Sequence, residues 1–171
     1  MGQPFLDLAA TLCPSCGRCC KSQPGGAAPE DFGSSREEII MNVRFALTEG
    51  NLRIDNWDGV AIMPVSDKDV MEPCWLRPAT KTTEKGRIFS GIYGGECVFL
   101  DSTSGCRLTV DDKKIRRPFE CRHLEPAPHC ECKVHYKNKL TVAEMWIDAG
   151  IDVRALGHAL IEDIPDLKGG W

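Results

Sequence analysis

The sequence predicts a small, loop-rich α+β domain that is stapled by metal and ends in a helical hairpin. Three observations favour this class: two stretches with helical apolar spacing, short alternating segments between them, and ten cysteines among 171 residues. The apolar content of 42% and the charged content of 27% are ordinary for a globular protein. We therefore expect a folded unit with a real core, in which the cysteines are the unusual feature.

The first predicted helix follows a loop rich in glycine and proline over residues 22–29. A serine followed three residues later by a glutamate occurs at Ser34 and again at Ser35, and either pair makes a capping box that begins the helix. Gly50 ends the helix. The apolar residues that recur on one face of it are Ile39, Ile40, Val43, Ala46 and Leu47.

Short β segments follow this helix. Residues 51–55 alternate between apolar and polar side chains, which predicts a strand that ends near an Asp-Gly turn. Residues 60–63 predict a second strand that forms a hairpin with the first. Residues 74–78 follow a polar loop and receive no regular element, and residues 79–95 are expected to be irregular or a weak hairpin.

The C-terminal end is predicted to be helical. Thr141 and Glu144 make a capping box for a helix over residues 142–149. Gly150 breaks that helix, and Asp152 caps a second one. The apolar positions of the second helix are Val153, Leu156, Leu160 and Ile161.

A pair of helices around a glycine turn is also typical of DNA-reading helix-turn-helix motifs. Residues 141–165 carry five acidic side chains and one basic one, which would repel phosphate. We therefore predict a cysteine-cluster domain over residues 1–135 and a helical arm over residues 136–171 that packs on it.

The strongest chemical signal is the run Cys13-Pro14-Ser15-Cys16-Gly17-Arg18-Cys19-Cys20. It holds four thiols within eight residues, and such crowding of soft ligands favours zinc, copper(I) or an iron–sulfur cluster. Two intervening residues let the chain curl so that two sulfurs reach one ion. Disulfides or inert buried cysteines are the alternative, and metal is the preferred interpretation.

The N-terminal stretch indicates which compartment to expect. It has no basic start, Asp7 interrupts the apolar run that a secretory signal needs, and no stretch is long enough to cross a bilayer. We therefore expect a cytoplasmic protein without a membrane partner, whose thiols stay reduced. The net charge of −4 offers no general attraction to nucleic acid.

A second cysteine-rich region lies near the middle of the chain. Cys97 and Cys106 flank a turn-forming segment over residues 101–105, so a hairpin there can bring the two thiols face to face. Cys121 follows a proline-directed turn and can converge on the same place.

The order of these motifs resembles the YkgJ-type CxxCxxCC cysteine-cluster family, whose members are described as zinc- or iron-chelating. A related segment occurs in a lysine N-methylase, where it holds an iron–sulfur cluster. The resemblance covers roughly residues 13–122 and is carried by the opening run, Cys-Val-Phe-Leu-Asp, Gly-Cys-Arg-Leu and Arg-Pro-x2-Cys-Arg. It implies that the metal-associated thiols are Cys13, Cys16, Cys19, Cys20, Cys97, Cys106 and Cys121. It also implies structural roles for Arg117 and Pro118.

The identity of the metal is open between zinc and iron. One or two zinc ions are the first choice, because a closed structural zinc site suits an all-thiol supply. A [4Fe-4S] cluster or iron is the alternative, because Cys13, Cys16 and Cys19 share the ferredoxin spacing, although the fourth Cys followed by Pro is absent. Cys19 and Cys20 are adjacent and point apart, which suggests that they serve different sites, or that one serves a cluster and the other packs in the protein.

Further candidate ligands lie outside these motifs. Cys130 and Cys132 form a tight pair, which we include among the predicted metal ligands. His123 and His129 are open as replacements for a thiolate, and so is Cys74 as a further ligand. Basic residues near Cys106 and Cys121 would help to hold an anionic site or would form a solvated turn; they are Lys113, Lys114, Arg116, Arg117 and Arg122.

Three functional hypotheses remain. The first is a metal-binding protein whose metal is mainly structural and which presents a surface to a protein partner. The second is an iron–sulfur redox or accessory protein for another enzyme, and the third is a metal-stabilised component of a larger assembly. The sequence contains no phosphate loop, dinucleotide fingerprint or zinc-protease motif, so it assigns no catalytic residue and no small-molecule substrate.

Overall fold

The computed structural model describes residues 20–21, 24–56, 74–90, 95–103, 105–108, 116–122 and 139–167. The predicted mixture of helix and strand is confirmed in these residues. In chain order, the elements are η1 (Pro29–Asp31), α3 (Arg36–Thr48), β1 (Leu52–Asn56), β2 (Cys74–Pro78), β3 (Phe89–Ser90), β4 (Leu100–Asp101), β5 (Gly105–Cys106), α4 (Phe119–Arg122), α5 (Lys139–Asp148) and α6 (Val153–Asp163).

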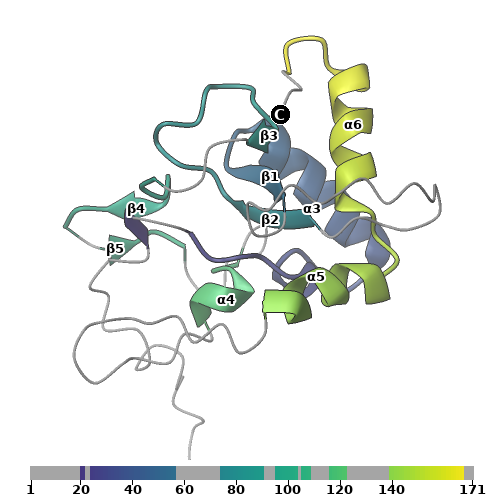
Figure 1. Cartoon of the computed structure of the whole chain (residues 1–171), viewed down its shortest axis with the longest axis horizontal. Helices are drawn as coiled ribbons and strands as arrows, with labels where there is room; N and C mark the ends of the chain where they lie inside the picture. Colours follow the sequence, from purple (N-terminus) through teal and green to yellow (C-terminus); the bar gives the residue numbers. More distant parts are fainter. Residues whose placement is uncertain are drawn as a thin grey trace, which may run out of the picture.

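A three-stranded sheet lies at the middle of this structure, with β1 between β2 and β3 (Figure 1). β1 runs antiparallel to β2 in a register that pairs Ile54 with Leu76 and Arg53 with Arg77. It runs parallel to β3, where Ile54 pairs with Phe89. Because side chains alternate along a strand and cross-strand partners share a face, this register gives the sheet one apolar face and one charged face.

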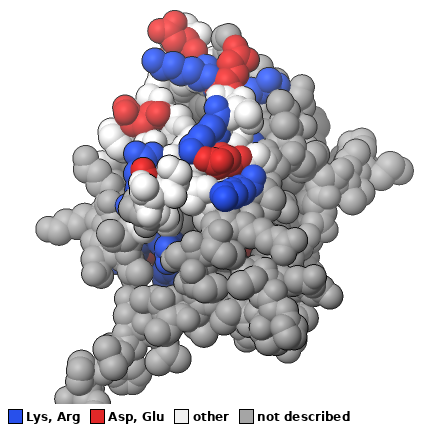
Figure 2. Space-filling model, turned by 90° about the vertical axis from the view of Figure 1, so that its left-hand side faces the viewer, with Lys and Arg blue, Asp and Glu red and all other residues white. Residues whose placement is uncertain are grey.

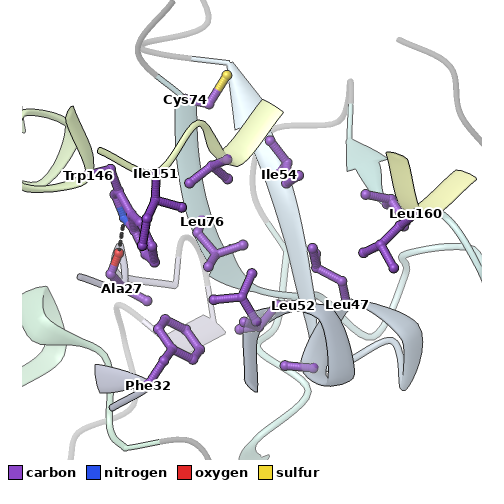
Figure 3. Close-up of a cluster of buried hydrophobic side chains, with 14 of the residues drawn as sticks. Ala27, Phe32, Leu47, Leu52, Ile54, Cys74, Leu76, Trp146, Ile151 and Leu160 are labelled. Carbon is purple, nitrogen blue, oxygen red and sulfur yellow. Dashed lines mark hydrogen bonds between the residues drawn. The ribbon is translucent and has the colours of Figure 1, made fainter. Parts of the chain in front are cut away.

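The apolar face of the sheet carries the core. Leu52 and Ile54 of β1 and Leu76 of β2 meet Leu47 of α3 and Leu160 of α6 in one buried cluster (Figure 3). Each such aliphatic side chain contributes on the order of 1.5–3 kcal/mol when it is fully buried. α3, α5 and α6 therefore pack on the apolar side of the sheet. The β4–β5 hairpin lies to the left of the sheet in Figure 1.

The C-terminal helix α6 approaches the sheet closely because it carries a glycine at the contact. A Cβ added to Gly157 would lie 2.6 Å from Ile54 Cδ1 and 2.8 Å from Phe89 Cζ. Any larger residue there would push the helix away from both strands. An ion pair between Arg44 of α3 and Asp163, at 2.8 Å, links the two helices at the surface.

The predicted helix signals of α3 and α6 are confirmed. Ser35 is the cap of α3, since its hydroxyl accepts the N–H of Glu38 at 3.2 Å. Gly50 follows the helix in the left-handed conformation, at a φ of 74°. Asp152 caps α6 by accepting the N–H of Ala155 at 2.9 Å.

The prediction for the start of α5 is wrong. The helix begins at Lys139, so Thr141 lies inside its first turn and does not cap it. The reason is that Lys and Leu at positions 139 and 140 are good helix formers, and they extend the helix toward the N-terminus.

The helical arm is also less of a hairpin than predicted. α5 contacts β2, whereas α6 contacts α3, β1 and β2, so each helix packs mainly on the sheet layer and not on the other helix. Trp146 of α5 is buried, and its indole N–H donates to the carbonyl of Ala27 at 2.8 Å (Figure 3). Both helices thus share the core of the rest of the chain; the predicted boundary between residues 135 and 136 lies outside the described residues.

The strand predictions had mixed outcomes. The strand predicted over residues 51–55 is β1, shifted by one residue. The strand predicted over residues 60–63, and the hairpin built on it, lie outside the described residues. Residues 74–78, for which no element was predicted, form β2, whose residues are all buried. Residues 79–95 are mostly irregular where they are described, but they supply β3.

Within the described ranges, every helix is too short or too polar to span a lipid bilayer.

Candidate metal centre

The end of the cysteine run lies beside the second cysteine-rich region. The backbone N–H of Cys97 donates to the carbonyl oxygen of Cys20 at 2.6 Å. Cys97 is buried and Cys20 is half-buried. Because Cys20 closes the run that begins at Cys13, this bond brings the tip of the run to the place where the motif order predicts a later ligand.

Cys97 is held from its other side by the chain that follows β2. Backbone hydrogen bonds of 2.9 and 2.8 Å on either side of Thr80 make Thr80 and Cys97 an antiparallel pair. The pair is of the non-hydrogen-bonded type, in which the Cα atoms are about 4.5 Å apart and the side chains point to the same side. Lys81, which follows Thr80, and Glu96, which precedes Cys97, form an ion pair beside this pair of residues.

Cys121 is brought to the same stretch of chain by α4. The N–H of Glu120 donates to the carbonyl of Gly26 at 3.1 Å, and the N–H of Gly26 donates to Glu120 Oε2 at 2.5 Å. A Cβ added to Gly25 would lie 2.8 Å from the sulfur of Cys121. The Cys121 thiol therefore rests directly on Gly25, only five residues beyond Cys20 in the sequence.

A buried carboxylate fixes the turn that carries Cys121. Asp31 Oδ2 accepts the N–H of Ala28 at 2.9 Å and the N–H of Phe119 at 2.7 Å. Its other oxygen forms an ion pair with Arg122, which also contacts Glu30 at 2.9 Å. Burial raises the pKa of Asp31, and the hydrogen bonds and Arg122 oppose that rise. Asp31 therefore connects the loop before α3 to α4.

Cys106 lies in the predicted hairpin, but with a different partner. The turn forms as expected, with the N–H of Thr103 donating to Asp101 Oδ1 at 2.9 Å. In the register of β4 and β5, Cys106 pairs with Leu100. Cys97 lies one turn before that strand, because the N–H of Leu100 donates to the Cys97 carbonyl at 3.0 Å. The prediction that Cys97 and Cys106 face each other across the hairpin is therefore wrong in register.

Cys74 belongs to the core and not to this region. It is buried in β2 within the hydrophobic cluster (Figure 3). Burial, reinforced by the negative charges of Asp152 and Asp55, raises the pKa of its thiol to about 12. Such a thiol stays protonated at neutral pH.

Several predicted ligands lie outside the described residues: Cys13, Cys16, Cys19, Cys130, Cys132, His123 and His129. Of the remaining candidates, Cys20, Cys97 and Cys121 converge on residues 20–26, and Cys106 lies on the adjoining hairpin. Within the part of the chain that the structure describes, three or more His, Cys, Asp or Glu side chains do not meet in a group that could hold an ion.

The described cysteines nevertheless suit a thiolate centre. Gly25 leaves the space that the Cys121 sulfur occupies, and Cys97 is buried at 5% exposure beside the end of a four-thiol run. Cys20, Cys97 and Cys121 are thus described thiols that lie in or beside residues 20–26, and thiolate donors in general select soft ions or iron–sulfur clusters.

The charged face of the sheet was not foreseen from the sequence. Arg53 and Asp55 of β1 and Arg77 of β2 are almost fully buried there, with exposures of 1%, 1% and 5%. The Asp55 carboxylate lies 3.3 Å from an Arg53 nitrogen and 3.5 Å from Arg77 Nε. Burial raises the pKa of Asp55 and lowers that of Arg53, and their mutual attraction opposes both shifts. The sequence did hold one signal for this face: Arg53 and Asp55 occupy alternate positions of the predicted strand over residues 51–55, so their side chains share one face.

The basic residues near the cysteines have partly defined roles. Arg122 is engaged with Asp31 and Glu30, and Lys113 and Lys114 lie outside the described residues. Figure 2 shows acidic and basic side chains interspersed over the described part of the face on the hairpin side of the molecule. This mixed surface does not form the single-sign stripe that is typical of a nucleic-acid interface.

Comparisons with known proteins identify no relative: no family model matches the chain, and no curated protein or solved structure matches it. The resemblance to the YkgJ-type family is neither supported nor opposed by this result. It remains a prediction from the cysteine motifs.

Proposed function

We propose that this protein binds metal through its cysteines, with the metal acting mainly as a structural staple that lets the domain present a surface to a protein partner. Zinc is the expected ion. The centre would use the run from Cys13 to Cys20 together with Cys97 and Cys121, while Cys106, Cys130 and Cys132 complete the set of candidate ligands. Cys74 would take no part.

One observation carries this proposal. The hydrogen bond between the Cys97 N–H and the Cys20 carbonyl joins the end of a Cys-x2-Cys-x2-Cys-Cys run to a buried cysteine far along the chain. A protein core gains little from placing cysteines in this way, because leucine or valine would bury more apolar surface. Shared ligation of a soft metal gives such convergence a chemical reason.

The deciding experiment is anaerobic purification of the full chain, followed by elemental analysis and a visible absorption spectrum. We expect a colourless protein with one or two zinc ions per chain. Cys97→Ser and Cys121→Ser should each lower the bound metal, whereas Cys74→Ala should retain all of it. A protein that emerges folded and metal-free from zinc-supplemented medium would refute the proposal.

A [4Fe-4S] redox or accessory role is the second candidate. The spacing of Cys13, Cys16 and Cys19, which matches the start of a ferredoxin run, favours it. The same purification distinguishes the two candidates, because a cluster would make the protein brown with broad visible absorption. Bound iron and inorganic sulfide in place of zinc would establish this second candidate.

The partner and the larger assembly of the third hypothesis remain predictions. α3 exposes Met41 and Phe45, one helical turn apart, at 62% and 44% of their surface. Light scattering of the full chain and of a Met41→Lys variant tests whether this face supports self-association. If both proteins are monomers, the third hypothesis requires a partner other than a second copy of this chain. Co-purification from the native host would then test for such a partner.

A further inference from the structure

Residues 24–28 form a largely buried strap between the sheet, α4 and α5. The sequence of the strap is Pro-Gly-Gly-Ala-Ala, so it carries no side chain larger than that of proline. Such side chains bury little apolar surface, and a Gly-Gly pair leaves the backbone many conformations when nothing holds it. The position of the strap therefore depends on the elements that its backbone contacts.

The sheet and α5 both hold the strap at Ala27. The backbone N–H of Ala27 donates to the carbonyl of Leu76 in β2 at 2.8 Å. Its carbonyl accepts the indole N–H of Trp146 in α5, also at 2.8 Å (Figure 3). The Trp146 ring lies 5.9 Å from the ring of Phe32, measured between ring centres. Because Ala27 is buried, its carbonyl must find another donor or become exposed to water if Trp146 withdraws.

The preceding residues of the strap hold α4. The N–H of Gly26 donates to Glu120 Oε2 at 2.5 Å, and the carbonyl of Gly26 accepts the N–H of Glu120 at 3.1 Å. The Cys121 sulfur lies against Gly25, where an added Cβ would be 2.8 Å from it. α4 has four residues, none of them fully buried, and a helix of this length is not stable by itself. These contacts with the strap therefore help to position α4.

A buried carboxylate joins the strap to α4 a second time. Asp31 Oδ2 accepts the N–H of Ala28, the last residue of the strap, at 2.9 Å. The same oxygen accepts the N–H of Phe119, the first residue of α4, at 2.7 Å. The other oxygen of Asp31 forms an ion pair with Arg122, the last residue of α4. The strap and α4 are thus connected at both ends of the helix, and movement of the strap disturbs α4.

We propose that the strap couples α5 to α4, so that docking of α5 through Trp146 keeps Cys121 against Gly25 and undocking of α5 releases both. The carbonyls that accept from Trp146 and from Glu120 belong to consecutive residues, so a shift of the backbone at one changes the geometry of the other. In the docked state the peptide groups of the strap are paired inside the protein, and in the released state water hydrates them. A partner that binds the C-terminal helices would therefore act on the cysteine region.

The test is hydrogen exchange of the full chain, followed by NMR at single N–H groups. Trp146→Phe keeps an aromatic ring in the core and removes the donor to the Ala27 carbonyl. The backbone N–H groups of Gly26, Phe119 and Glu120 should then exchange about fivefold faster, the factor that corresponds to the loss of one net hydrogen bond. Parent exchange rates at these groups in Trp146→Phe would show that α5 does not hold the strap, and would overturn the coupling.

Gly157→Ala is the matched control, because it disturbs the contact of α6 with the sheet and not the strap. It should lower the free energy of unfolding and speed exchange of the Ile54 N–H, which donates to the Ile88 carbonyl at 2.8 Å. The N–H groups of the strap and α4 should keep their parent rates, since they exchange by local release. If they accelerate equally in Gly157→Ala and Trp146→Phe, they exchange only when the whole chain unfolds, and the coupling is wrong.

The coupling must also act in the opposite direction, because linkage between two sites is reciprocal. Glu120→Ala removes the acceptor of the Gly26 N–H and should speed exchange of the Trp146 indole N–H several-fold. The loss of one indole signal in Trp146→Phe identifies this group among the four tryptophans of the chain. A parent rate for the indole N–H in Glu120→Ala would overturn the coupling, and this variant carries the test alone if Trp146→Phe does not fold. No readout involves bound metal, so the outcome is separate from that of the proposed function.

Discussion

Replacing Gly25 by alanine tests directly whether Cys121 is a metal ligand. The added Cβ would lie 2.8 Å from the Cys121 sulfur, 3.0 Å from Glu120 Cβ and 3.1 Å from the Cys121 nitrogen. Two of these three neighbours are not flexible ends of side chains, so α4 must shift as a unit. Overpacking of this kind costs about 1–3 kcal/mol in a folded protein.

The expected result is that Gly25→Ala destabilises the zinc-saturated protein more than the metal-free protein. If Cys121 leaves the centre, zinc affinity falls by at least tenfold, which adds about 1.4 kcal/mol to the loss in the metal-bound form. The assay is urea unfolding with and without saturating zinc, together with a chelator competition for affinity.

Gly150→Ala is the matched control. Gly150 has a φ of 64° and no atom within 4 Å of an added Cβ, so alanine there strains the backbone without touching a cysteine. It should lower the stability of both forms equally, by about 1 kcal/mol. Equal losses for Gly25→Ala in the two forms, with unchanged zinc affinity, would show that Cys121 is not a ligand.

Three further predictions follow from the described contacts. Cys74→Ala should keep the metal and cost about 1–2 kcal/mol of stability. The thiol of Cys74 has a pKa of about 12 in the folded protein and of 9.0 ordinarily, so above pH 9 only the unfolded chain loses this proton. The stability of the wild type should therefore fall by about 1.4 kcal/mol per pH unit above pH 9, and the variant should lack this fall. Gly157→Ala should cost about 1–3 kcal/mol in urea unfolding, because its Cβ would meet Ile54 Cδ1 at 2.6 Å. Asp31→Ala should cost about 1–3 kcal/mol, because it leaves two backbone N–H groups without their acceptor and removes one of the two carboxylates that contact Arg122, and it should lower zinc retention with the stability.

Each of these predictions has a contrary outcome. Loss of zinc in Cys74→Ala would make that thiol a ligand. An alkaline stability curve that is the same for wild type and Cys74→Ala would contradict the raised pKa of the thiol. Wild-type stability of Gly157→Ala would contradict the close contact of α6 with the sheet. Full stability of Asp31→Ala would contradict its role in connecting the loop before α3 to α4.

Local features were the most readable from the sequence. The caps at Ser35 and Asp152 and the stop at Gly50 were predicted because a hydroxyl, a carboxylate and a residue without Cβ act on their immediate neighbours. β1 was predicted from its alternation. β2 was missed because it is buried on both faces: Cys74 and Leu76 face the apolar core while Trp75 and Arg77 face the charged cluster, so no polar-apolar alternation marks it.

The candidate site divides in the same way. The run between Cys13 and Cys20 already indicated that the candidate site would be built from cysteines. The burial of Cys74 in the core, the contact of the Cys121 sulfur with Gly25 and the pairing of Cys106 with Leu100 were not evident, because spacing in the chain does not state which face of a strand or which side of a turn a thiol takes.

By itself, the sequence determined the mixed α+β class, two of the helix caps, and the chemistry to look for, since these depend on short-range spacing and on the donor atoms of side chains. Only the tertiary structure decided that Cys97 adjoins Cys20 and that Arg53, Asp55 and Arg77 are buried on one face of the sheet. Such neighbours come from strand register and from layers packed across distant parts of the chain. The energetic cost of a buried charge depends on which charged and polar groups the fold places next to it.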